Sequence, residues 1–286
     1  MAMRKSVQIK GGAILALTLV TLCIWYAALH EDHRGLLTVS FLDIGQGDSI
    51  FIQAPSGGQV LIDGGPDSSV LRQLGRVMPW YDHSIDVLVA THPDADHISG
   101  LIDVLGRYDV VTIVQSSVRG STDMWKTFTT AAGGEGAQLV QAERGQVLEL
   151  GGGVRLEILF PDRSMPHVET NEGCVVARLV YGETAFMLPC DTTSAVERYL
   201  VQLDGENLKS DVLKAGHHGS KTSSSALFLG YVNPEYGIYS RGCDNKYGHP
   251  SPETTERFVQ FGIPTFDTCK EGTITFVSDG QTVRRD

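Results

Sequence analysis

The feature that most constrains the fold is a short polar segment between an apolar run and a helical pattern. Residues 85–90 (IDVLVA) form the continuous branched run that is typical of a buried parallel strand. Apolar residues then recur at helical spacing from Ile98 to Leu105 and stop at Gly106. The polar segment between them therefore lies after the carboxyl end of a central strand, where open α/β sheets place their active sites.

Four side chains of this segment are of types that bind divalent metals: His92, Asp94, Asp96 and His97. In an extended chain the first three project to one side, and His97 opens the helix. The group could serve two adjacent ions. The alternative is a polar loop in which Asp94 or Asp96 only caps the helix. Two histidines and two aspartates this close together have little structural use, so the spacing favours a metal site.

Other carboxylates also follow apolar strands. Asp63 ends the strand at 59–63, and Asp48 lies in a glycine-rich turn. Each of them either shapes its turn or orients a metal-bound histidine. Asp191 follows the apolar run at 184–188 and either caps the next helix or bridges two metals, one oxygen to each. Taken with the 92–97 segment, its position favours the bridge.

The segment DVLKAGHHGSKTS, residues 211–223, is the second strong metal-binding signal. A strand runs directly into His217 and His218, which are flanked by glycines. One of the two histidines is expected to coordinate, and the sequence does not decide which. Ser220 and Lys221 could hold an anion at the start of the next helix.

The segment NKYGHP, residues 245–250, is a third and weaker cluster. It lacks the strict spacing of a metal motif. His249 is a candidate acid or phosphate contact, and Asn245 is a candidate substrate contact.

Charge and cysteine content narrow the function classes. The 286-residue chain has a formal net charge of −11. An acidic chain binds nucleic acid poorly without specific contacts, so a phosphate-bearing substrate must be held by local cations or metal. The five cysteines form no CxxC motif and no disulfide framework, although Cys243 and Cys269 could form a bridge.

Residues 1–34 have the pattern of a membrane anchor. Basic residues precede an apolar run at 11–29, which is long enough to cross a bilayer. No small-x-small cleavage site follows, so an uncleaved single-pass anchor is favoured over a signal peptide that would release a secreted protein. The positive-inside rule then places the large domain outside the cytoplasm.

Residues 35–286 are expected to form one domain, a four-layer αββα sandwich of the α/β class, because an antiparallel start is followed by alternating strands and helices. The expected helices lie near 67–78, 97–106, 122–132, 192–203, 222–231 and 252–261. The expected strands lie near 37–43, 50–53, 59–63, 86–90, 110–115, 137–141, 154–160, 174–181, 184–188, 211–215, 235–240, 264–268 and 273–277.

Taken together, the motifs FLDIGQGDS, LIDGG, THPDADHISGL, DVLKAGHHGSKTS and NKYGHP, with the strand that ends in Asp191, resemble the metallo-β-lactamase-fold domain of the ComEC/Rec2 competence family. The resemblance covers residues 37–280. It implies the αββα fold, an extracytoplasmic hydrolase, and metal-dependent attack on phosphodiesters, with nuclease activity on the non-transported strand of DNA. The family also has a many-helix membrane channel, so the resemblance implies a hydrolase domain that is made separately and works beside a separate DNA-uptake channel.

The resemblance also assigns roles. The implied metal ligands are His92, Asp94, Asp96, His97, Asp191 as the bridge, and His217 or His218. Asp94 stands where many superfamily members have a histidine, and Asn171 fits another position where a histidine is usual. The first site becomes richer in oxygen, so two divalent ions are expected, Zn²⁺ or Mn²⁺, with Mg²⁺ as a further candidate. Asp96 would also steer the attacking water, while Lys221 and His249 would stabilise charge on the phosphoryl oxygens.

Two other function classes stay open. A hydrolase of the same fold could act on a small ester, a lactone, a β-lactam or a cell-wall phosphodiester, and the net negative charge favours such a substrate over a long polyanion. The domain could instead be a metal-stabilised binding module without catalysis. One tightly held ion and no hydrolysis would identify that third class.

Overall fold

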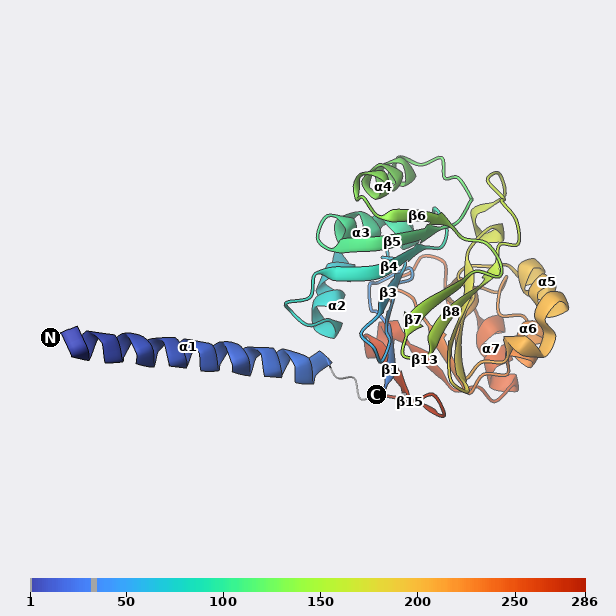
Figure 1. Ribbon diagram of the computed structural model, residues 1–286. Helices are drawn as coiled ribbons and strands as arrows, with labels where there is room; N and C mark the ends of the chain where they lie inside the picture. The colour runs from blue at the N-terminus through green and yellow to red at the C-terminus, as the bar shows by residue number, and fades with distance from the viewer. Residues whose placement is uncertain (1, 32–34) are drawn as a thin grey trace.

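The computed structural model describes residues 2–31 and 35–286. Two mixed β-sheets pack face to face, and helices cover the outer face of each sheet (Figure 1). This arrangement confirms the four-layer αββα sandwich expected from the sequence.

The first sheet has eight strands in the order β15–β14–β1–β2–β3–β4–β5–β6. Pairing is antiparallel from β15 to β3 and parallel from β3 to β6. Its strands are β1 (Leu37–Phe41), β2 (Ile50–Gln53), β3 (Gln59–Ile62), β4 (Ser84–Ala90), β5 (Asp109–Gln115), β6 (Gln138–Gln141), β14 (Ile274–Ser278) and β15 (Val283–Arg285). The parallel strands β3 and β4 end at one edge of the sheet, so Asp63 and His92 follow at that edge.

The second sheet has seven strands in the order β13–β12–β11–β10–β9–β8–β7. Its strands are β7 (Val147–Gly151), β8 (Val154–Phe160), β9 (Val176–Tyr181), β10 (Thr184–Leu188), β11 (Val212–Lys214), β12 (Tyr236–Tyr239) and β13 (Thr265–Asp267). Pairing is parallel from β10 to β13. Asp191 and the His217–His218 pair therefore follow neighbouring strand ends, those of β10 and β11.

Each expected helix is present, within a few residues of its expected ends. The first sheet is covered by α2 (Ser69–Val77), α3 (Ala95–Leu105) and α4 (Asp123–Gly134). The second is covered by α5 (Ser194–Asp204), α6 (Ala226–Val232) and α7 (Pro252–Gln260). Hydroxyl caps begin several of them: Thr122 Oγ1 accepts from Trp125 N at the start of α4. The short helix α8 (Thr268–Glu271) and the 3₁₀ turns η1 (Thr170–Glu172), η2 (Gly205–Leu208) and η3 (Gly216–Gly219) complete the order.

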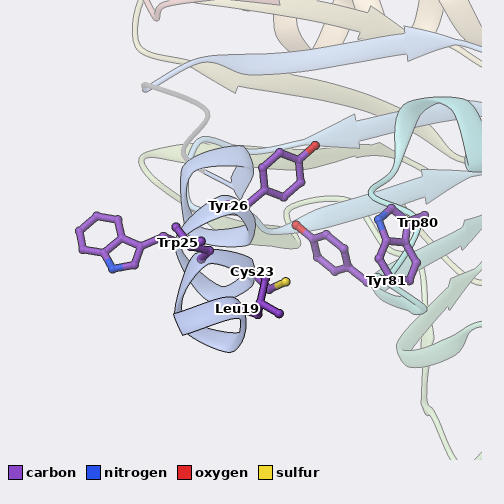
Figure 2. Close-up of a pocket in the computed structure, with 7 residues that line it drawn as sticks. Leu19, Cys23, Trp25, Tyr26, Trp80 and Tyr81 are labelled. Atoms are coloured by element: carbon purple, nitrogen blue, oxygen red, sulfur yellow. The ribbon is translucent and has the colours of Figure 1, made fainter. Parts of the chain in front are cut away.

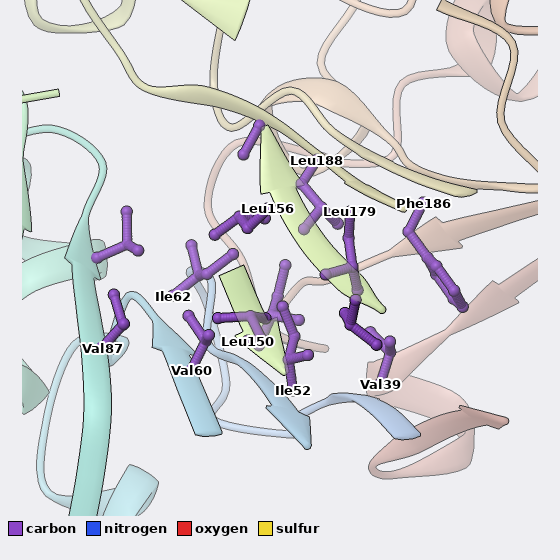
Figure 3. Close-up of a cluster of buried hydrophobic side chains, with 14 of the residues drawn as sticks. Val39, Ile52, Val60, Ile62, Val87, Leu150, Leu156, Leu179, Phe186 and Leu188 are labelled. Carbon is purple, nitrogen blue, oxygen red and sulfur yellow. The ribbon is translucent and has the colours of Figure 1, made fainter. Parts of the chain in front are cut away.

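The main core lies between the sheets. Side chains alternate across each strand, so Ile50 and Ile52 of β2 face the other sheet while Phe51 faces the helices. Figure 3 shows side chains of both sheets meeting in this layer. Among them are Val39, Ile52 and Val60 from the first sheet and Leu156, Leu179 and Phe186 from the second. The apolar core between the sheets thus fixes the positions of the strand ends that carry the polar residues.

The N-terminal helix α1 (Ala2–Glu31) projects away from the sandwich (Figure 1). Its last turns lie beside the loop that carries Trp80 and Tyr81, and a pocket of about 680 Å³ opens between them (Figure 2). Within the described parts of the chain, no helix has the length and apolarity that a membrane crossing requires.

The single-pass anchor expected at residues 11–29 is therefore not supported. Residues 1 and 32–34, which belong to the expected anchor segment 1–34, lie outside the described residues.

Candidate metal centre

Polar side chains converge where the strand ends of the two sheets meet. The first sheet supplies Asp63 and His92 after β3 and β4, and the second supplies Lys214 and Asp191 at the ends of β11 and β10. Ion pairs and ring contacts join residues that lie more than one hundred positions apart in the sequence, such as Asp48 and His218. The cluster therefore depends on the packing of both sheets.

The 92–97 segment forms one wall of the cluster. The ring centroids of His92 and His97 lie 4.1 Å apart, and His92 Nε2 is 3.5 Å from Asp94 Oδ2. Asp94 stands at the N-cap position of α3, but its side chain makes no capping hydrogen bond. The capping alternative for Asp94 therefore has no support in the geometry.

Asp63 fixes the orientation of His97. Its buried carboxylate accepts hydrogen bonds from Thr91 N at 2.9 Å and Thr91 Oγ1 at 2.6 Å. It also lies 2.7 Å from His97 Nδ1. Because an ionised carboxylate only accepts, His97 carries its proton on Nδ1, which leaves the Nε2 lone pair directed into the cluster.

Asp191 lies at the centre of the cluster. Its Oδ2 is 3.1 Å from His218 Nε2, 3.4 Å from His97 Nε2 and 3.7 Å from His217 Nε2. Its Oδ1 is 3.3 Å from Lys214 Nζ. The lysine engages one oxygen, so only Oδ2 faces the histidines. This differs from the expectation of one oxygen for each of two ions.

Of the paired histidines, His218 has the geometry of a ligand. It is buried, its Nδ1 donates to the Ser240 carbonyl at 2.9 Å, and its Nε2 is 3.5 Å from Asp96 Oδ2. His217 is partly exposed, and its ring lies 5.6 Å from that of His249. The choice that the sequence left open therefore favours His218.

Lys214 was not identified from the sequence. It is fully buried at the end of β11 and forms ion pairs with Asp48 and Asp191. Asp48 Oδ1 also lies 3.3 Å from His218 Nδ1. The only signal in the sequence was a charged residue that ends the apolar strand DVLK, and buried lysines are rare unless paired.

The charges of the cluster shift its pKa values. Burial raises the pKa of Asp96, but the close imidazole of His218 and the charge of His97 outweigh it and lower the pKa to about 2. Burial lowers the pKa of His97 and of His218, yet Asp191 and the other adjacent carboxylates raise both well above their usual range. The cluster therefore attracts positive charge, which a divalent cation supplies.

The donor atoms fit a divalent metal. The Nε2 atoms of His92, His97 and His218 are buried and lack a hydrogen-bond partner among the described residues, which is rare for buried polar atoms. Ligand atoms of Asp96, His97 and His218 lie within 4.8 Å of one another, as do those of Asp48, Asp191 and His218. Mixed imidazole and carboxylate donors suit zinc and manganese.

Two disulfides border this region. Cys243–Cys269, which the sequence offered as a possible bridge, is present. Cys174–Cys190 was missed because its spacing follows no pattern. Its two sulfurs lie 3.6 and 3.3 Å from His92 Nδ1, so this bridge packs directly against the histidine.

The backbone of the cluster has an uncommon conformation. Positive φ angles occur at Asp63 (58°), Cys190 (54°), His217 (49°) and His218 (55°). Each of these residues follows the end of a strand, where the chain must turn sharply to direct its side chain inward.

Asn171 and the 220–221 pair lie around the cluster. The side-chain oxygen of Asn171 is buried without a hydrogen-bond partner within the described chain. Ser220 hydrogen-bonds Thr222 and shapes the turn after His218. Lys221 is exposed, and no ion pair joins it to a described carboxylate. The anion-binding role of Ser220 and Lys221 stays a prediction.

Asn245 and His249 belong to one loop. Asn245 Nδ2 donates to the carbonyls of Gly242 and His249, and Asn245 Oδ1 accepts from His249 N. Burial and the neighbouring His217 lower the pKa of His249 to about 4. A neutral imidazole at pH 7 suits a hydrogen-bonding contact to substrate better than an acid.

Comparison with known proteins shows the family of this chain. A family model described as the metallo-beta-lactamase superfamily matches residues 42–242. The chain is 29% identical to ComE operon protein 3 of Bacillus subtilis, covering 94% of this chain and 36% of that protein. It is 31% identical to competence protein ComA of Neisseria gonorrhoeae, covering 83% and 32%. It is 25% identical to recombination protein 2 of Haemophilus influenzae, covering 90% and 31%. The chain thus spans about a third of these relatives.

Solved structures agree on the fold. CmlA, a diiron beta-hydroxylase from Streptomyces venezuelae, superposes with a TM-score of 0.53 at 14% identity over 81% of this chain and 52% of that one. Zn²⁺-bound PqqB from Methylobacterium extorquens gives 0.50 at 12% identity over 81% and 97%. Both matches concern the fold alone, and both proteins are described with bound or active-site metal.

Proposed function

This chain belongs to the metallo-β-lactamase superfamily and is a metal-dependent hydrolase related to competence proteins, and from this premise we propose that it is a phosphodiesterase that cleaves DNA outside the cytoplasm. One observation carries the proposal. The Nε2 atoms of His97 and His218 are buried, lie 3.4 and 3.1 Å from Asp191 Oδ2, and have no hydrogen-bond partner among the described residues. That arrangement has little structural use and is what a metal-dependent hydrolase requires.

We assign two ions to the site. His92, Asp94 and Asp191 would hold one, and Asp96, His97, His218 and Asp191 would hold the other. The cluster has five carboxylates, with Asp48 and Asp63 as the two that orient histidines, and one buried ammonium. With the histidines counted as neutral metal ligands, its formal charge of about four negative units matches two divalent cations. When bound, such ions would lower the pKa of a water molecule and neutralise charge on phosphoryl oxygens.

The residues of the chain supply positioning. Asp94 and Asp96 are partly exposed, with 40% and 30% of their side chains accessible, so Asp96 can accept a hydrogen bond from a water that enters from solvent. Asp63 and the Ser240 carbonyl hold the tautomers of His97 and His218. His249 sits beside His217 at the mouth, where it can donate a hydrogen bond to a substrate oxygen.

Two observations support action outside the cytoplasm on DNA. Two disulfides are typical of an oxidising compartment. The relatives carry competence and recombination in their names. Single-stranded DNA is therefore the substrate that we propose, with a separate DNA-uptake channel as the partner.

The test is a panel of substrates with added Zn²⁺ or Mn²⁺: single-stranded DNA, bis-p-nitrophenyl phosphate, a β-lactam and a lactone. We expect hydrolysis of both diesters, abolished in Asp96→Ala. The matched control is Asp103→Ala, an exposed aspartate on the same helix, which should keep full activity with the same circular dichroism spectrum. Undiminished turnover in Asp96→Ala contradicts the proposal.

The net charge of −11 favours a second candidate, a small or neutral substrate of the same catalytic site. Turnover of the lactone or β-lactam with no cleavage of either diester would identify that class. Tight binding of one ion without any hydrolysis would instead identify a binding module.

A further inference from the structure

A second recess adjoins the metal centre. A cavity of about 370 Å³ is lined by Asp96 of the metal centre and by Gln46, Asp244, Lys246 and Tyr247, among other residues. Because Asp96 belongs to both the recess and the metal centre, a group in the recess lies next to the reacting phosphate.

Tyr247 is an exposed aromatic residue with a fixed position. Its side chain is 57% exposed, and its ring stacks on His249 at 5.7 Å with an interplanar angle of 24°. Lys246 Nζ lies 5.2 Å from the same ring. Exposed aromatic rings that line a recess beside a phosphate site are typical of stacking platforms for bases.

The loop that carries Tyr247 is held rigidly. The side chain of Asn245 forms three hydrogen bonds within the loop, to Gly242 and His249. The Cys243–Cys269 disulfide ties it to the neighbouring segment. The role of Asn245 is therefore to hold the loop. The Tyr247 ring is already in position before a ligand binds, which limits the conformational entropy lost when a ligand stacks on it.

Gln46 supplies an independent indication of a ligand. Its Oε1 accepts a hydrogen bond from Gly242 N, so the amide orientation is set and Nε2 is directed away from that contact. Nε2 is buried and has no partner among the described residues. An unpaired buried donor in the wall of a recess suits a carbonyl or phosphoryl oxygen of a ligand.

From these contacts we infer that the recess binds a nucleobase of single-stranded nucleic acid, which stacks on Tyr247 and accepts a hydrogen bond from Gln46 while Lys246 contacts the adjoining phosphate. The inference rests on the proposed phosphodiesterase function and names the residues that hold its substrate. It also explains how an acidic protein can hold a polyanion, since neutral stacking supplies affinity that the charge of the surface does not.

The test uses the full chain with Mn²⁺ and a hydrolysis-resistant phosphorothioate oligothymidylate. Binding is followed by fluorescence anisotropy for the wild type, Tyr247→Ala and Tyr247→Phe. We expect Tyr247→Ala to weaken binding by about 5- to 150-fold and Tyr247→Phe to bind like the wild type. A 2-aminopurine base in the oligonucleotide should be quenched by the wild type and not by Tyr247→Ala.

Two controls make the result specific. Trp80→Ala removes an exposed aromatic residue near the opposite end of β4, beside α1, and should bind like the wild type (Figure 2). An oligonucleotide with abasic tetrahydrofuran units should bind wild type and Tyr247→Ala equally weakly.

The outcomes separate the two proposals. Equal binding of thymidylate by the wild type and Tyr247→Ala overturns the nucleobase site, even if both cleave diesters. Displacement of 2-aminopurine by millimolar phosphocholine, with no loss of oligonucleotide affinity in Tyr247→Ala, overturns it in favour of a quaternary ammonium ligand. Failure of the wild type to cleave any diester, with base-dependent binding intact, overturns the phosphodiesterase and leaves the binding site standing.

Discussion

Replacing Asp63 by Asn should impair metal binding, although the two side chains have the same shape and the same number of non-hydrogen atoms. Asn tolerates the left-handed backbone at this position, where φ is 58°, so the turn should survive. The amide has only one oxygen, and Thr91 N needs it at the place of Oδ1. The NH₂ group then faces His97 Nδ1, which must accept the hydrogen bond and move its proton to Nε2. The lone pair that would hold a metal is lost.

The magnitude follows from the same contacts. Loss of a partner that orients a ligand typically costs 10- to 100-fold in metal affinity, or ~1.4–2.8 kcal/mol at 1.4 kcal/mol for each tenfold change. The assay is competition for Zn²⁺ or Mn²⁺ against a chromophoric chelator. The matched control is Asp86→Asn, because Asp86 also accepts a backbone hydrogen bond, from Gln59 N at 2.8 Å, but lies away from the cluster. Wild-type affinity in Asp63→Asn would refute the reasoning about the tautomer.

Four further measurements test the structure. Chelation with EDTA should lower the midpoint of thermal unfolding, since an ion at 100 times its Kd stabilises the fold by ~2.7 kcal/mol; an unchanged midpoint would contradict a resident ion. Phe186→Ala, in the layer between the sheets, should lower the free energy of unfolding in urea by ~3–5 kcal/mol, whereas a loss below ~1 kcal/mol would speak against tight packing there. Paired replacement of Cys243 and Cys269 by Ala should cost ~3.5 kcal/mol, because the closed loop spans 26 positions, and unchanged stability would argue against the bridge. Burial raises the pKa of Glu197 despite backbone hydrogen bonds from Ser224 and Ser225, so its stabilising contribution is complete below its unfolded value and is lost as pH rises through the folded one. The stability of the wild type relative to Glu197→Gln should therefore fall as pH rises from ~4.5, and a constant difference in urea titrations would exclude this effect.

The sequence predicted the layers well because patterns at single strands and helices carry that information. The run at 85–90 became β4, and the helical spacing from Ile98 to Leu105 became most of α3. The strand β7 (Val147–Gly151) was missed because it is short, Glu149 interrupts its apolar residues, and its side chains are mostly exposed. The membrane anchor was expected from the basic and apolar residue types of residues 1–34, and the described helix does not support it.

The sequence predicted most residues of the candidate site but not the contacts between them. The 92–97 segment and Asp191 were recognisable because metal-ligand residue types followed apolar strands. Nothing local could identify Lys214 as the partner of Asp191, since that ion pair depends on the parallel register of β10 and β11. For the same reason the sequence could not choose between His217 and His218, because His218 differs by its contacts with distant residues such as Ser240, which follows β12.

The four positive φ angles at Asp63, Cys190, His217 and His218 have a thermodynamic consequence. For residues other than glycine each costs roughly 1–2 kcal/mol, so the strand ends around the centre hold several kilocalories of backbone strain. This end of the sandwich should therefore be the part of the core that opens first, and its amide hydrogens should exchange faster with solvent than those in the middle of the same strands. A bound ligand that holds these turns in place would slow that exchange, and the hydrolase would become locally rigid only when it is ready to act.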